Sequence, residues 1–222
     1  MTFDEKKADI QSELEILNYI NDRLEQDIPE TLFDPGIAAL NGDHVLNMDV
    51  EGTTGLAEKI RPAAVLVPIV KYTDRLSLIL TTRSAHLSSH AGQVAFPGGK
   101  VDEEDVTIID TALRETEEEV GIHRKNIEIL GYLDSYQTAT GFRILPIVGI
   151  IEEGYSYNID RNEVEDLFEV PLKFLMSPEN HKKESLFWRN KDRHFYSMPY
   201  EDRNIWGATA GIIRNLYERL YC

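Results

Sequence analysis

The stretch from Gln93 to Ile122 constrains the fold of this chain more than any other. It reads QVAFPGGKVDEEDVTIIDTALRETEEEVGI: a short apolar segment, a Pro-Gly-Gly turn, an acidic lead-in and a helix that ends at a glycine. Like charges one helical turn apart repel each other. Four glutamates nevertheless crowd into five positions of this helix: Glu115, Glu117, Glu118 and Glu119. A surface that tolerates such repulsion is expected to face something cationic.

The ends and the buried face of this helix are predicted from residue type and spacing. Asp102 is a good N-cap residue, and Asp105 three positions later completes a capping-box-like pair. Gly121 is placed to form the C-terminal cap. An apolar stripe with spacings of three and four is expected to pack on a sheet: Val106, Ile109, Leu113, Thr116 and Val120.

Three of the glutamates converge on another face of the predicted helix. On a helical wheel Glu115, Glu118 and Glu119 lie nearly opposite the apolar stripe, whereas Glu117 lies at its edge. Arg114 precedes Glu118 by one turn, where it can hold that carboxylate in place. The alternative for an arbitrary acidic run is a solvated surface. The order R-E-x-x-E-E-x-G, at a fixed distance from Gly-Gly, argues against coincidence.

These carboxylates, with a turn at Gly98–Gly99 that can add a backbone carbonyl, form an oxygen-rich site suited to Mg²⁺ or Mn²⁺. Such ions bridge to substrate phosphates, neutralise charge and activate water. Glu115 and Glu119, at i and i+4 on what is expected to be an exposed face, are the strongest candidate ligands. Glu118 is the next candidate, as a ligand or as the base that activates water.

The rest of the chain predicts an α/β or α+β fold with a mixed sheet. Strands are expected at 62–70 and 75–83, paired as a hairpin, and at 127–136 and 142–151. A polar loop over 86–93 separates the hairpin from the central stretch. Further along, the pattern predicts a polar loop running into a helical turn over 152–167, a short helix over 170–177, a hairpin joining 185–189 to 194–199, and an amphipathic helix over about 203–220 that includes Ile205 and Trp206.

Residues 4–27 read as an amphipathic helix, followed by chain-breaking prolines and glycines. This helix either packs on its own domain or serves as a dimerisation arm, so a homodimer is one possible assembly. We therefore divide the chain into an N-terminal helical extension, residues 1–55, and a main domain, residues 56–222.

The chain of 222 residues has a net charge of −16. So acidic a molecule repels nucleic acid and anionic membranes, and an anionic substrate needs a metal ion or a local basic pocket. Its single cysteine, Cys222, excludes an intrachain disulfide and a thiolate zinc site. Without a signal-peptide pattern or a long apolar run, a soluble cytoplasmic protein is expected.

Residues Gly99 to Ile122 resemble the Nudix box, the signature of hydrolases that cleave a nucleoside diphosphate linked to another group. The second half of the box is matched by Arg114-Glu115-Thr116-Glu117-Glu118-Glu119-Val120-Gly121-Ile122. The first half departs from the usual pattern by one extra residue and by Asp105 in place of a glutamate. The resemblance implies the Nudix α/β/α sandwich with a mixed sheet.

An extended box also occurs in the coenzyme A pyrophosphatase-like subfamily, which this chain resembles in a second motif upstream. That motif is matched by Ile79-Leu80-Thr81-Thr82-Arg83-Ser84, Gly92 and Phe96-Pro97-Gly98-Gly99, with Ser88 where the subfamily has an arginine. Segments 162–172 and 205–207 are also similar, so the resemblance covers roughly residues 60–215. It implies hydrolysis of CoA or acyl-CoA. Ser88 leaves open another dinucleotide, such as NADH or ADP-ribose, and a non-catalytic nucleotide-binding domain is a further alternative that the intact glutamates argue against.

Six residues outside the box are further candidates. Arg83 ends a strand, where its guanidinium can take a phosphate or form a surface ion pair. His86 and His90 are four positions apart, a spacing that suits two zinc ligands on a helix. The surrounding serines and glycine favour a loop instead, in which these histidines form hydrogen bonds or contact a phosphate. Glu163 is either an additional metal ligand or general base, or an acid at a helix N-terminus. Two aromatic residues near a connecting loop, Tyr136 and Phe142, either stack on an adenine or pack in the core.

Overall fold

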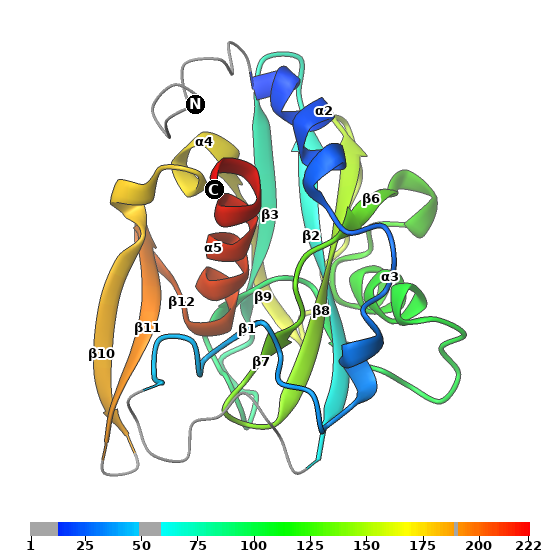
Figure 1. Ribbon diagram of the computed structural model, residues 1–222. Helices are drawn as coiled ribbons and strands as arrows, with labels where there is room; N and C mark the ends of the chain where they lie inside the picture. The colour runs from blue at the N-terminus through cyan, green and yellow to red at the C-terminus, as the bar shows by residue number, and fades with distance from the viewer. Residues whose placement is uncertain (1–12, 49–58, 189–190) are drawn as a thin grey trace.

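The computed structural model describes residues 13–48, 59–188 and 191–222. A large sheet forms its centre, with helices on both sides and a smaller sheet beside it (Figure 1). In chain order the helices are α2 (Glu13–Arg23), α3 (Ile108–Val120), α4 (Leu172–Leu175) and α5 (Gly207–Tyr221). The strands are β1 (Asn41–Gly42), β2 (Arg61–Lys71), β3 (Leu76–Arg83), β4 (Val94–Ala95), β5 (Gly98–Lys100), β6 (Glu128–Tyr132), β7 (Tyr136–Gln137), β8 (Phe142–Glu152), β9 (Val164–Pro171), β10 (Lys182–Trp188), β11 (Lys191–Tyr200) and β12 (Arg203–Trp206).

The large sheet is mixed, as predicted. Its strand order is β1-β7-β8-β2-β3-β4, with β5 paired to β2, β6 to β8 and β9 to β3. The long strands β2 and β8 run parallel over their whole length, from Arg61 opposite Phe142 to Lys71 opposite Glu152. The predicted hairpins are also present, β2 with β3 and β10 with β11. Parallel central strands are buried on both faces, which explains their nearly continuous apolar sequences.

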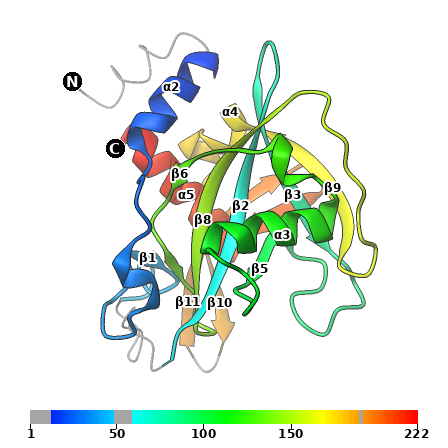
Figure 2. The ribbon, with the colours of Figure 1, turned by 90° about the vertical axis from the view of Figure 1, so that its right-hand side faces the viewer.

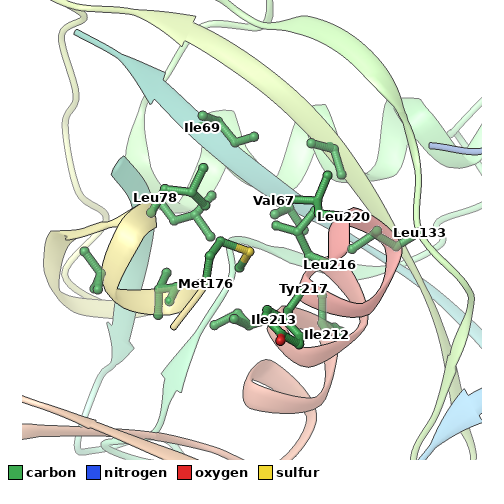
Figure 3. Packing of buried hydrophobic residues seen from close by; sticks show 14 of the residues in the cluster. Val67, Ile69, Leu78, Leu133, Met176, Ile212, Ile213, Leu216, Tyr217 and Leu220 are labelled. Atoms are coloured by element: carbon green, nitrogen blue, oxygen red, sulfur yellow. The ribbon is translucent and has the colours of Figure 1, made fainter. Parts of the chain in front are cut away.

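Successive side chains of β2 point to opposite faces of this sheet. On one face Ala64 and Leu66 pack with Ala112 of α3, which lies across β2 and β8 (Figure 2). On the other face Val67 and Ile69 pack against α5 (Figure 3). The buried residues of α5 in this cluster include Ile212, Ile213, Leu216 and Leu220. Helices thus cover both faces, and the predicted α/β/α sandwich is confirmed.

The N-terminal part joins the same core. Ile16, Ile20 and Leu24 of α2 and the segment after it belong to the cluster formed with α5. Further on, β1 pairs in parallel with β7. The first residues of the helix predicted over 4–27 and the domain boundary at residue 55 lie outside the described ranges. Among the helices of those ranges, none has both the length and the apolarity that crossing a membrane requires.

The central helix begins later than predicted. Thr107, not Asp102, is the N-cap, and it forms a reciprocal capping box with Asp110. Asp102 and Asp105 instead form a turn before the helix: Asp102 N–H donates to Asp105 Oδ2 at 2.9 Å, and Arg114 binds the same carboxylate. Val106 consequently lies before the helix and is 90% exposed, so its predicted place in the buried stripe is wrong.

Two other predicted helical segments are strands. Residues 203–206 form β12, where Ile205 lies opposite Met198 of β11, and the last helix starts only at Gly207. The turn predicted near the end of 152–167 is present only at 160–164, where the N–H groups of Glu163 and Val164 donate to Asp160 O; from Val164 on the chain is β9, which pairs with β3. Pairing with β11 and with β3 decides these cases, because a short segment with apolar residues fits either a helix or a strand until its partner is known.

Candidate active site

The site is built around the C-terminal half of α3. Gly121 ends the helix as predicted, with φ 69° and its N–H bonded to the carbonyl of Glu117. The following carbonyls are taken by a distant loop: Asp160 N–H donates to Glu119 O at 3.0 Å and Asn158 N–H to Val120 O at 2.8 Å. The loop that carries Glu163 is thereby fixed against the helix end.

Arg114 is the hub of an ion-pair network. Its Nε and Nη2 donate to both oxygens of Asp105, at 2.9 and 3.0 Å. Its Nη1 lies 2.9 Å from Glu115 Oε1 and 2.9 Å from Glu118 Oε2, so the predicted contact with Glu118 is confirmed. The hydroxyl of Thr111 also donates to Asp105, at 2.8 Å. Bidentate bonding to arginine holds the pKa of the Asp105 carboxyl far below its usual range.

Glu119 is the buried carboxylate of the site, with only 4% of its side chain exposed. Gly98 N–H donates to its Oε2 at 3.1 Å, and Arg83 Nη1 lies 3.7 Å from its Oε1. Burial raises its pKa to about 8, the two donors oppose that rise, and the charges of Glu115 and Glu163 add to it. The expectation that this carboxylate lies on an exposed helix face is therefore wrong, because β5 and the end of β3 cover it.

Glu115 lies against the glycine turn. A methyl group added at Gly99 would come within 2.4 to 2.6 Å of the Glu115 carboxylate, so only glycine leaves room for it. Burial raises the pKa of Glu115, Arg114 lowers it, and the charges of Glu118 and Glu163 raise it further. These mutual effects bring Glu163 into the carboxylate cluster. It directly precedes β9, so the alternative of a helix N-terminal acid is wrong.

The remaining candidates lie at the rim. Glu118 keeps 58% of its side chain exposed. His86 and His90 lie exposed in the loop between β3 and β4, where His90 Nδ1 is 2.7 Å from Gln93 Oε1. Tyr136 is buried and donates to Asp43 at 2.7 Å, so the core alternative holds for this residue.

The backbone contributions were not foreseen from sequence. Gly98 N–H serves the site as a donor to Glu119, whereas a carbonyl ligand from this turn was expected. The carbonyl of Lys100 accepts from Arg114 Nη2 at 3.3 Å. Neither contact can be predicted from residue type, because both use backbone atoms. The two consecutive glycines were the available indication that a backbone approaches the site closely.

The donor chemistry suits a divalent cation that prefers oxygen. The charges of Glu115 and Glu163 raise the pKa of Glu119, and among the described residues Arg83 is the cation paired with Glu119. In the described part of the chain no three His, Cys, Asp or Glu side chains already converge as ligands. Glu115 and Glu118 are instead bonded to Arg114. The carboxylates therefore fit such an ion by charge and oxygen chemistry.

Comparison with known proteins identifies the class. The sequence model of the NUDIX domain matches residues 60–199, and the chain belongs to the Nudix hydrolase family. Members of this family are hydrolases of pyrophosphate bonds that generally use a divalent cation.

Among its relatives are Nudix hydrolase NudL proteins. The chain is 43% identical over 156 residues to NudL of Citrobacter koseri, covering 70% of this chain and 81% of the relative. NudL of Escherichia fergusonii gives the same values. A solved structure of the NUDIX domain of Shewanella oneidensis NrtR with ADP-ribose has a TM-score of 0.48 and 20% identity, covering 74% of this chain and 90% of that one.

Proposed function

We propose that this Nudix hydrolase cleaves the pyrophosphate bond of coenzyme A or acyl-CoA, with Mg²⁺ or Mn²⁺ as cofactor. Water adds across one P–O–P bridge, and the products are 3′,5′-ADP and 4′-phosphopantetheine or its acyl form. The observation that carries the proposal is the contact between the two sequence motifs: Arg83, from the motif typical of CoA pyrophosphatases, lies 3.7 Å from Glu119 of the Nudix box.

Two further contacts support a single site made from these motifs. Ser84 N–H donates to the carbonyl of Glu163 at 2.9 Å, and its hydroxyl donates to the carbonyl of Arg161 at 3.0 Å. The loop that starts at Ser84 is thus tied to the segment that carries the additional carboxylate. His86 and His90, in the same loop, are exposed and available to a substrate that approaches from solvent.

The roles of the side chains follow from their surroundings. Glu115, Glu119 and Glu118 would hold the cation, which when bound would supply positive charge to the diphosphate and activate the attacking water. Arg114 orients Glu115 and Glu118 through the bonds described above. Arg83 and the Gly98–Gly99 turn position the diphosphate, because a guanidinium matches phosphate oxygens and glycines permit close approach.

A second substrate class stays open because of Ser88. This exposed residue stands where the CoA pyrophosphatase motif has an arginine, so one cation of the motif is absent. NADH or ADP-ribose, which have a diphosphate but no phosphomonoester, are the alternatives that this loss favours.

The test is turnover of CoA, NADH, ADP-ribose and diadenosine polyphosphates with Mg²⁺ or Mn²⁺. Glu118→Gln is the control for contaminating activity, because it keeps the shape of the side chain and removes its charge. We expect CoA or acyl-CoA to have the highest kcat/KM. Faster cleavage of NADH or ADP-ribose overturns the substrate, and binding without turnover of any compound overturns the reaction.

A further inference from the structure

Three residues at one end of the large sheet form a cationic cluster around an aromatic ring. The guanidinium carbon of Arg61 lies 4.0 Å from the ring centroid of Phe142, and Lys100 Nζ lies 5.8 Å from the same centroid. Arg61 and Lys100 are exposed, and Phe142 is half-buried. An aromatic ring attracts cations to its face, so Phe142 holds two like charges close together.

No acidic side chain of the described residues pairs with the cations of this cluster, in contrast to Arg114 of the Nudix box. Arg61 bonds the carbonyl of Thr140, and neither Arg61 nor Lys100 forms an ion pair with a carboxylate of the described residues. Arg114, by comparison, contacts three carboxylates. In a chain with net charge −16, two adjacent cations that no described carboxylate neutralises make this surface locally favourable for an anion.

The cluster lies on the other side of β5 from the carboxylates. Gly99 is paired with Ala64, on the face covered by α3, and Glu115 lies against it. Lys100 is the next residue, so its side chain points to the opposite face. Arg61 and Phe142 are direct partners across β2 and β8, and register places them on that same opposite face.

The two places are adjacent along a short strand. Strand β5 is only three residues long, and among the described strands it pairs with β2 alone. One residue along a strand spans only about 3.3 Å, so Lys100 lies close to the turn that positions the diphosphate. A compact nucleotide with a second phosphate group can therefore straddle this short strand.

We propose that Arg61 and Lys100, held by Phe142, bind a phosphomonoester of the substrate and select for substrates that carry one in addition to the diphosphate. A phosphomonoester carries nearly two negative charges at pH 7, which two neighbouring cations match. This inference rests on the proposed function: CoA has a 3′-phosphate on its ADP unit, whereas NADH and ADP-ribose have none. It also indicates how the chain can recognise CoA although Ser88 replaces an arginine.

The test compares kcat/KM for CoA with kcat/KM for 3′-dephospho-CoA in the full chain. A charged hydrogen bond to phosphate changes affinity by about tenfold or more, so we expect Arg61→Gln and Lys100→Met each to lower the CoA preference by about tenfold, through KM rather than kcat. Arg23→Gln, which removes a cation 4.7 Å from the ring of Tyr19, and Lys173→Met, at an exposed position on α4, are matched controls that keep the preference. An unchanged preference in both test variants overturns the inference.

A binding measurement separates this inference from the proposed function. Calorimetric titration with 3′,5′-ADP and with 5′-AMP reports the phosphomonoester site without turnover. If the wild type fails to hydrolyse CoA, the proposed function fails. The inference then still requires tighter binding of 3′,5′-ADP than of 5′-AMP, and loss of that difference in Arg61→Gln. Equal affinities in the wild type overturn it.

Discussion

Replacing Arg114 with methionine tests whether the ion-pair network stabilises the site. Methionine keeps much of the apolar stem and removes both bonds to Asp105, whose side chain is 3% exposed. The carboxylate would keep only the Thr111 hydroxyl and the Asp102 N–H as donors. Removing one partner of a fully buried pair costs about 3 to 5 kcal/mol. Because Arg114 is 25% exposed, solvent screens part of this, and we expect a loss of about 3 kcal/mol.

The loss should depend on pH. The folded-state pKa of Asp105 is held below its ordinary value of 3.8, so its contribution to stability is fully present above that value and is lost as the pH falls below it. The difference between the wild type and Arg114→Met is therefore expected to be constant near neutral pH. It should shrink under acid conditions, as Asp105 becomes protonated in the unfolded chain and then in the folded one.

The assay is urea unfolding followed by circular dichroism, in wild type and variants at several pH values. The control Arg124→Met removes contacts with Glu117 and Asp110 of the same helix, but this arginine is 41% exposed, and surface pairs contribute about 1 kcal/mol or less. Adding Asp105→Asn to Arg114→Met should restore much of the stability, since the buried side chain at position 105 then carries no charge. Equal losses in Arg114→Met and Arg124→Met would refute the reasoning.

Three further predictions concern single positions. Gly99→Ala should push the Glu115 carboxylate out of place and lower affinity for Mn²⁺ by calorimetry, whereas unchanged affinity would contradict the close contact. Ile20→Ala should destabilise the chain by about 2 to 5 kcal/mol in urea unfolding, because Ile20 is fully buried. The control Leu40→Ala, at a position 83% exposed, should change stability by about 0.5 kcal/mol or less. If Ile20→Ala and Leu40→Ala lost the same stability, α2 would not be part of the core. Thr116→Val should change stability by less than about 1 kcal/mol, because the Thr116 hydroxyl only shares a helix carbonyl already bonded to an N–H; a larger loss would show that this bond matters.

The sheet was predictable because its strands have strong local signals. Segments 62–70 and 142–151 are apolar, rich in β-branched residues and bounded by polar turns, and they became β2 and β8. Their parallel pairing was not predicted. It depends on which strands meet in the folded chain, and register between distant segments is set by burial of both faces rather than by local sequence.

The helix start was mispredicted because two positions offered similar capping chemistry. Aspartate and threonine are both N-cap residues, and each of Asp102 and Thr107 is followed by an aspartate three positions later. Asp102 and Asp105 do bond to each other, but in a turn before the helix, where Arg114 also holds the Asp105 carboxylate from the next turns of the chain. Local propensity contains no information about that contact.

The burial of Glu119 could not be derived from a helical wheel. A wheel separates the face that packs on the sheet from the remainder and treats the remainder as solvated. Here a second set of neighbours, Gly98 and Arg83, covers one edge of the remaining face. Sequence therefore identified which carboxylates are close together, while their order of exposure required the positions of β5 and of the end of β3.

The difference in exposure among the carboxylates has a chemical consequence. Glu115 and Glu118 each accept a hydrogen bond from Arg114, whereas Glu119 has one backbone donor and an arginine at 3.7 Å, which is longer than a hydrogen bond. A buried carboxylate with so little compensation is unfavourable as an anion, and burial accordingly raises its pKa to about 8. An incoming cation gains most where the existing charge is least compensated. We therefore expect Glu119 to contribute most to metal affinity among the three glutamates. Once Glu119 binds the metal, Arg83 is available to bind the substrate phosphate.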